Sequence, residues 1–284
     1  MLLLSLLLAG ASALQAQTPL PTPAQFVRFL DLRCYKIPNQ PPINVPLQLD
    51  HLNPVFVAKG FPPEFVKLQE AQELCVPVRK EQQLIDPAAL PFLRYADLKC
   101  YRIFGPSLDF DLILDQLNPV MYNLFGPQVK VTVREPQQLC VPVAKAGAAP
   151  PPDIARLIRW LDVKCYRIDA DPFLGNRPIN LTHLNPLFAG IPSEQAKILE
   201  PAPIQLCVPV AKNQTYPPDD VRRIISYSDV LCYQLAGLPL NRQLQLRHLN
   251  PVLQNMGLPL EDVFVTETTK LCVPVAKNGD FPPG

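Results

Sequence analysis

The three histidines of this chain are the side chains best suited to acid–base or metal chemistry, and all three occupy one position of an internal repeat. Each directly precedes a Leu-Asn-Pro motif, and a fourth copy of that motif has glutamine there. A histidine can serve as a general base or a metal ligand, whereas a glutamine is no base and a poor ligand. We therefore expect a structural role, with hydrogen bonding across a turn, for His51, Gln116, His183 and His248.

Acidic residues recur in the same way. Each copy has an aspartate three residues before its first cysteine (Asp31, Asp97, Asp162 and Asp229), and three copies have a glutamate five residues before the last (Glu70, Glu135 and Glu267). Paired carboxylates can hydrolyse glycosidic bonds. Four equivalent active sites in four tiny units would be unusual, so turn capping or a strand-edge role is expected. No G-x-S-x-G elbow is present, and we predict no catalytic residue.

The eight cysteines form a regular series. Within successive pairs the offsets are 41, 40, 42 and 40 residues, and the offset between pairs is always 25. An even, regularly spaced set in an exported chain is typical of a disulfide framework, and a bridge over a loop of this length contributes about 2–4 kcal/mol. We favour pairing within each copy over pairing across copies: Cys34 with Cys75, Cys100 with Cys140, Cys165 with Cys207, and Cys232 with Cys272.

Metal and redox sites fit the cysteines less well. Both usually need close pairs such as C-x-x-C, and none occurs in the sequence. We therefore predict neither a metal site nor a cofactor.

Other motifs recur at the same period, which marks one repeated structural unit. Each copy contains Cys-Tyr, then Leu-Asn-Pro, then Leu-Cys-Val-Pro-Val and a closing lysine. The predicted boundaries are 24–80, 90–146, 152–212 and 218–278. We expect the four tyrosines to pack in the core beside the disulfides (Tyr35, Tyr101, Tyr166 and Tyr233) and the four lysines to be solvated edge charges (Lys80, Lys145, Lys212 and Lys277).

Hydrophobic periodicity predicts mainly strands. Apolar residues two apart precede each Leu-Asn-Pro, as Leu47 and Leu49 do in copy one, and this spacing places them on one face of a half-buried strand. Asn-Pro should end that strand, and the proline of Leu-Cys-Val-Pro-Val suggests an edge or a strand end. Ile154, Leu157 and Ile158 have helical spacing. The predicted fold is all-β: four tandem small disulfide-stapled β modules with short helical turns between them.

Composition limits the classes of partner. Lys plus Arg is 26 and Asp plus Glu is 25, so no basic excess points to nucleic acid. The chain has 36 prolines, which disfavour long helices. Residues 1–16 resemble a signal peptide, with an apolar run followed by small residues. We expect a secreted or periplasmic protein with no membrane insertion once this signal is removed.

The repeat resembles one found in exported bacterial proteins of unknown function, with the pattern L-x-C-Y-x-V, then D-Q-F-G, then V-x-x-P-x-x-L-C-x-P-V-x-K. The first element appears here at residues 98–103 as Leu-Lys-Cys-Tyr-Arg-Ile, with isoleucine in place of valine, and residues 133–145 match the last. The middle element departs, because Asp-Gln-Leu-Asn-Pro stands at 115–119. The resemblance implies secretion and a β-rich disulfide module, and it implies no activity.

These observations favour a non-enzymatic binding or structural module, since weak sites in series gain by avidity. Two alternatives stay open: an extracytoplasmic hydrolase and a disulfide-rich inhibitor. The partner is unknown, and a cell-envelope or extracellular ligand is the expected kind. The segments between Cys-Tyr and Leu-Asn-Pro vary most between copies, as residues 38–44 and 104–110 show. We expect ligand contacts in these segments.

Non-reducing peptide mapping of the exported protein tests the predicted bridges. Because the cysteine spacing repeats once per copy, we expect four cross-linked peptides, each joining the two cysteines of one copy, and an intact mass without residues 1–16. Free thiols, or a bridge such as Cys75 with Cys100, would contradict the prediction.

Overall fold

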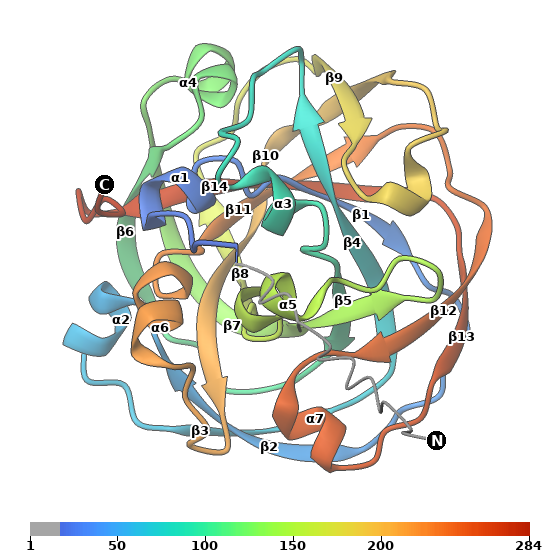
Figure 1. The fold of residues 1–284 in the computed structure, drawn as a ribbon. Helices are drawn as coiled ribbons and strands as arrows, with labels where there is room; N and C mark the ends of the chain where they lie inside the picture. Colours follow the sequence, from blue (N-terminus) through green and yellow to red (C-terminus); the bar gives the residue numbers. More distant parts are fainter. Residues whose placement is uncertain (1–17) are drawn as a thin grey trace, which may run out of the picture.

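The computed structural model describes residues 18–284, so the predicted signal peptide lies outside the described residues. Fourteen strands form one continuous sheet, in which each copy supplies two strands to an inner ring (Figure 1). The ring strands are β1 (Leu32–Lys36), β4 (Ala71–Lys80), β5 (Leu98–Arg102), β7 (Gln128–Lys145), β8 (Val163–Ala170), β10 (Glu194–Lys212), β11 (Val230–Ala236) and β14 (Thr268–Lys277).

This ring is a closed barrel of eight antiparallel strands. Each ring strand pairs with the next in the order just given, and β14 pairs with β1, so Leu32 lies opposite Cys272. The first and last copies therefore meet. Closure leaves no inner strand with an unpaired edge.

A second layer of strands covers the outside of the barrel. It consists of β2 (Val45–His51), β3 (Glu64–Leu68), β6 (Phe110–Gln116), β9 (Arg177–His183), β12 (Arg242–His248) and β13 (Glu261–Val265), together with the first parts of β7 and β10, which pair with β6 and β9. In copy one β2 and β3 form a hairpin that packs on β5 of copy two, the strand that carries Tyr101. In copy four β12 and β13 form a hairpin that packs on β1 of copy one, the strand that carries Tyr35. We call each of these tyrosine-bearing strands the tyrosine strand of its copy. Each copy thus buries the outer face of the next.

The same outer strands also reach the copy two places along the chain. The strand β2 of copy one pairs with the end of β10 in copy three, β6 with β14, β9 with β4, and β12 with β7. The fold class that the sequence predicts is confirmed as all-β with four disulfides and short helices. The four copies nevertheless share one barrel and one set of cores, so they interlock as parts of a single unit.

The proline of Leu-Cys-Val-Pro-Val lies inside a strand, where an edge position or a strand end was expected. Along β4 the neighbour is β5 up to Cys75 and β9 from Val78, so Pro77 stands where the partner changes. Between these two partner strands the N–H of residue 77 would have no ladder partner, so the N–H that proline lacks costs little here. The Pro77 carbonyl still accepts a hydrogen bond from the Leu184 amide, at 3.0 Å. Pro142, Pro209 and Pro274 accept equivalent bonds.

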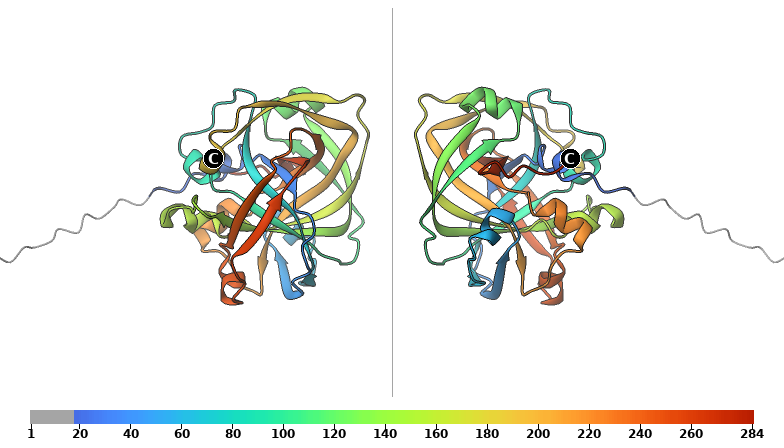
Figure 2. Two further views of the ribbon diagram at one scale, coloured as in Figure 1. Left: turned by 90° about the vertical axis from the view of Figure 1, so that its right-hand side faces the viewer. Right: turned by 90° about the vertical axis from the view of Figure 1, so that its left-hand side faces the viewer.

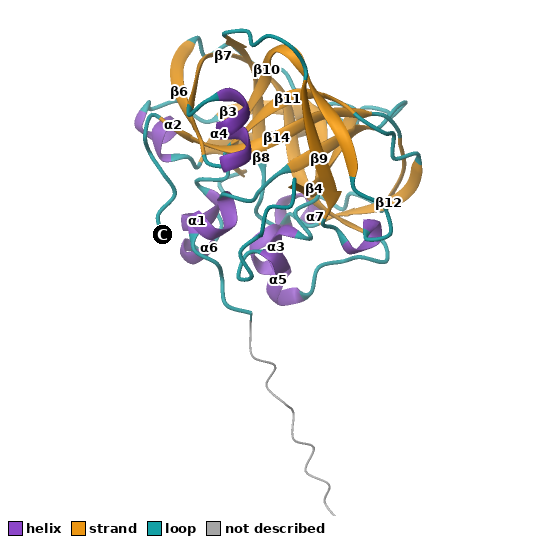
Figure 3. Ribbon diagram, turned by 90° about the horizontal axis from the view of Figure 1, so that it is seen from above, coloured by secondary structure: helices purple, strands orange, loops and turns teal. Residues whose placement is uncertain are grey.

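Short helices lie before the first strand of each copy, as predicted. They are α1 (Pro23–Val27), α3 (Leu90–Leu93), α5 (Pro152–Ile158) and α6 (Asp219–Ile225). Their apolar side chains form one core with all eight cysteines, and Figure 3 shows the four helices gathered at one end of the barrel. They close that end.

The Asn-Pro motifs end the preceding strands, as expected, and each also begins a helical turn. These turns are α2 (Pro54–Ala58), α4 (Pro119–Phe125), η1 (Pro186–Phe188) and α7 (Pro251–Asn255). The asparagine side chain accepts the amide hydrogen two residues on, as Asn53 does from Val55 at 3.0 Å, and the proline occupies the first helical position, where its missing N–H has no cost.

The side views in Figure 2 show the strands wrapped around one axis and the described N-terminus near the C-terminus. The Ala24 amide donates to the Pro283 carbonyl at 3.0 Å. None of the helices in residues 18–284 is long and apolar enough to cross a membrane.

Closure of the barrel predicts that its chain order can be permuted but that no copy can be removed. A circular permutant with the two ends joined by a short linker and new ends at residues 214 and 215 should keep the wild-type circular dichroism spectrum and unfold cooperatively. A chain that lacks residues 218–284 leaves β1 and β10 with open edges and should aggregate on size-exclusion chromatography. A well-folded monomer of the shortened chain would contradict the closed architecture.

Candidate ligand-binding site

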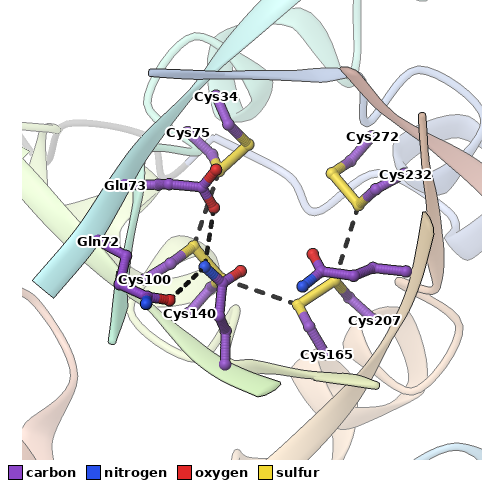
Figure 4. The surroundings of a disulfide bond; sticks show 12 residues. Cys34, Gln72, Glu73, Cys75, Cys100, Cys140, Cys165, Cys207, Cys232 and Cys272 are labelled. Atoms are coloured by element: carbon purple, nitrogen blue, oxygen red, sulfur yellow. Dashed lines mark hydrogen bonds between the residues drawn. A yellow bond between two sulfur atoms is a disulfide. The ribbon is translucent and has the colours of Figure 1, made fainter. Parts of the chain in front are cut away.

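The barrel interior is built in layers by the inward side chains of the ring strands. The layer nearest the helices holds Leu32 opposite Pro77 and its equivalents, and the next holds the cysteines, with Cys34 directly opposite Cys75. All four bridges join the two cysteines of one copy, as the repeat predicts. Sulfurs of successive bridges lie 3.7–3.8 Å apart. Oxidised sulfurs have no hydrogen to donate, so the dashed sulfur contacts in Figure 4 are van der Waals contacts around the lumen.

The third layer is polar and differs between the copies. The position two residues before each closing cysteine carries Glu73, Gln138, Gln205 or Lys270, and all four side chains are buried. The Lys270 ammonium lies 2.7 Å from the Glu73 carboxylate and donates to the amide oxygens of the two glutamines at 2.6 and 2.7 Å. Burial raises the pKa of Glu73, but the charge of Lys270 together with hydrogen bonds from Lys270, Thr269 and Gln138 outweighs burial, so this pKa lies below its usual value.

Three ion pairs stand around the open end of the barrel, above this polar layer. Each joins an acid of one copy to a base of the next: Glu70 with Arg102 at 2.8 Å, Glu135 with Arg167 at 2.6 Å, and Glu267 with Lys36 at 2.9 Å. The glutamates singled out in the sequence therefore bind bases: Glu70 and Glu267 directly precede β4 and β14, and Glu135 lies within β7. They are not arranged as pairs of carboxylates.

Two adjoining cavities occupy this open end, which we call the barrel mouth. Their volumes are about 610 and 420 Å³, within the usual range for small-molecule sites. They share Gln72, Arg102 and Gln138 in their walls. Residues 38–40 line the first and Phe104 lines the second, so two of the variable segments do reach a cavity.

The lysines that close each copy are wholly buried, and the expectation of solvated edge charges was wrong. The Lys80 ammonium binds the Asp31 carboxylate of the same copy, and the other three copies repeat this pair. Burial raises the pKa of Asp162 and of Asp229 to about 6, against the effect of their lysines. The closing strand is thus tied to the turn before the first strand.

Three of the four aspartates also bind the asparagine of Leu-Asn-Pro from the following copy. Asn185 donates to Asp97 at 2.6 Å, Asn250 to Asp162 at 2.5 Å, and Asn53 of copy one to Asp229 of copy four at 2.6 Å. Capping of a turn by the aspartate itself, which the sequence suggested, is not the main role. Three aspartates thus bind the helical turn of the following copy, whereas Asn118 of copy two donates to Gln83 at 2.7 Å.

The tyrosines and the histidine position meet on the outer face of the barrel. Tyr35 lies 3.0 Å from His183, Tyr101 lies 3.0 Å from His248, Tyr166 lies 3.2 Å from His51, and Gln116 donates to Tyr233 at 3.0 Å. Each pair joins copies two apart, whereas hydrogen bonding across a turn was expected. The tyrosines are in the core, as predicted, but they face away from the disulfides because they follow the cysteines by one residue.

Buried charges complete these outer clusters. The residue before the first cysteine is basic in three copies, and Arg33 binds Glu194, Lys99 binds Glu261 and Lys164 binds Glu64. The fourth place has Leu231 with Val129, both within one apolar cluster. Three of the four places therefore have both charges and the fourth has neither, so no buried charge at these places lacks a partner.

The histidines of these clusters are neutral at pH 7. Burial and the nearby charge of Arg33 lower the pKa of His183 to about 3, and burial lowers the pKa of His51 and His248. A base with so low a pKa accepts protons poorly at neutral pH. Within residues 18–284 no group of three or more His, Cys, Asp or Glu side chains could hold a metal ion.

The polar layer of the lumen is the feature that sequence reasoning missed. The repeat alignment contained a signal: the position directly before each closing Leu-Cys is Glu73, Gln138, Gln205 or Lys270, so the copies differ in charge where the following residues agree. Only a closed ring makes these four residues converge.

No family model matches the chain, and neither a curated protein nor a solved structure is significantly similar to it.

The Glu64 cluster predicts a specific loss of stability in acid. Burial alone would raise the pKa of Glu64, but the hydrogen bond from His51 and the charge of Lys164 hold it at about 2. A carboxyl group whose pKa is lower in the folded state than in the unfolded state stabilises the fold above the unfolded pKa of about 4.3. This stabilisation is lost as pH falls toward 2. Glu64→Gln should therefore lower Tm at pH 7, and the gap from wild type should shrink between pH 5 and pH 2.

Thermal unfolding of both proteins across that range is the measurement. Glu267→Gln is the control, because its ion pair with Lys36 is mostly exposed and should contribute little at any pH. A gap for Glu64→Gln that stays constant from pH 7 to pH 2 would contradict the assignment.

Proposed function

We propose that this protein is a non-enzymatic binding protein that acts outside the cytoplasm and takes a small ligand into the barrel mouth. The observation that carries the proposal is the pair of adjoining cavities over a floor of buried polar side chains from all four copies. Mouths of β-barrels are a preferred place for ligands. The other end is closed by helices, so a ligand has one route of entry.

The disulfides support an extracytoplasmic location, because such bonds persist in oxidising compartments. Four bridges are present, and the described residues contain no free cysteine. The resemblance to exported bacterial repeat proteins agrees with this location. The sequence favoured four weak sites in series, which gain by avidity. In the closed ring the copies surround one central mouth, so we propose one shared site.

The proposal is tested by a ligand screen that reports position. The oxidised protein is incubated with pools of sugars, amino acids, nucleosides and small carboxylic acids, and bound compounds are identified by native mass spectrometry. Side-chain amide signals of the glutamines in the NMR spectrum then locate each hit. We expect at least one hit that shifts the signals of Gln72 and Gln138, because both line the mouth.

A blocked variant provides the control. Thr269 is half-buried in the wall of the larger cavity, and Thr269→Trp should fill that space and abolish binding while Tm stays close to wild type. Gln72→Trp blocks the shared wall and serves if the first variant is unstable. Hits that survive both substitutions, or that shift only signals elsewhere, would contradict the proposal.

A further inference from the structure

The charges of the barrel mouth cancel. Its inward and rim positions hold four bases and four acids, and each base binds one of these acids: Lys36 with Glu267, Arg102 with Glu70, Arg167 with Glu135, and Lys270 with Glu73. Arg167 also binds Asp169 at 2.5 Å, outside this set. A charged ligand would have to displace one partner and leave the other unpaired, at a cost that grows with burial. The mouth therefore favours a ligand without net charge.

Primary amides dominate the smaller cavity. Gln72, Gln137, Gln138 and Gln205 all line it. Gln205 donates to Gln137 at 2.6 Å, and Gln138 donates to Gln72 at 2.8 Å. Each amide has two donors and one acceptor oxygen with two lone pairs. Gln138 also donates to Glu73, and Lys270 donates to the oxygens of Gln138 and Gln205, so the capacity for a ligand lies chiefly in the N–H groups of Gln137 and Gln205. A group that both donates and accepts, such as a hydroxyl, matches them best, and an apolar ligand would leave them unsatisfied.

An exposed aromatic ring stands beside these amides. Phe104 lines the same cavity and is 64% exposed, although it is large and apolar. It follows Ile103, which is buried, at the start of a variable segment. A sugar ring carries hydroxyls around its edge and C–H groups on its faces. It can therefore hydrogen-bond to amides and pack a face on an aromatic ring at the same time.

We propose that the barrel mouth binds a neutral, hydroxyl-rich ligand, the end of a saccharide, with Phe104 against a sugar face and the glutamines on its hydroxyls. This inference rests on the proposed function and names the ligand class of that same site. The paired charges act as further fixed hydrogen-bonding groups, since a carboxylate in an ion pair keeps lone pairs and a guanidinium keeps N–H groups.

The test is calorimetric titration of the oxidised protein with four uncharged probes: maltotriose, cellotriose, triacetylchitotriose and mannotriose. At least one should bind and shift the amide signals of Gln137 and Gln205. Phe104→Ala should lower the affinity for that probe by about tenfold, equivalent to about 1.4 kcal/mol of binding free energy. Phe65→Ala is the matched control, because Phe65 is 81% exposed and lines neither mouth cavity; it should leave affinity unchanged.

The outcomes separate this inference from the proposed function. Binding of glutamate, citrate or a nucleotide at the mouth, with no response to the saccharides, overturns the ligand class and leaves the mouth as a binding site. Equal loss of saccharide affinity in Phe104→Ala and Phe65→Ala overturns the placement of the sugar on Phe104. If no probe of any class shifts a mouth signal, both proposals fail.

Discussion

The ladder between β1 and β14 is the contact on which the rest of the structure depends. It joins the first copy to the last and turns a row of four similar units into a ring. Only after closure do the inward side chains of eight strands face a common axis, with the sulfurs in one layer and the polar residues in the next. An open row would leave two strand edges unpaired and the cysteine layer exposed along one side.

The outer layer locks the ring because each copy needs two others. Its hairpin covers the tyrosine strand of the next copy, and its first hairpin strand pairs with the copy after that. Buried ion pairs such as Arg33 with Glu194 and Lys99 with Glu261 join copies that are two places apart in the chain. A buried charge without its partner is strongly destabilising, so these pairs penalise any arrangement that brings the wrong copies together.

The sequence predicted what is local to one copy. Alternating residues such as Leu47 and Leu49 lie on the buried face of a strand, the helical spacing around Ile154 marks a helix, and the cysteines pair within copies. Contacts between copies were not predictable, because every copy has nearly the same partner groups and periodicity does not say which copy supplies them. Lys80 was expected to be solvated for a different reason: its partner Asp31 belongs to the same copy but lies 49 residues earlier in the chain, and the apolar periodicity does not reveal a buried ion pair.

The polar layer of the lumen has a consequence for symmetry. In a ring of four identical chains, any side chain at the axis would meet three copies of itself, so an acid or a base placed there would face three like charges. Four fused copies can mutate independently, and here they provide one acid, one base and two amides at that height: Glu73, Lys270, Gln138 and Gln205. Covalent linkage of the repeats therefore permits a buried acid–base pair at the axis, which strict fourfold symmetry forbids.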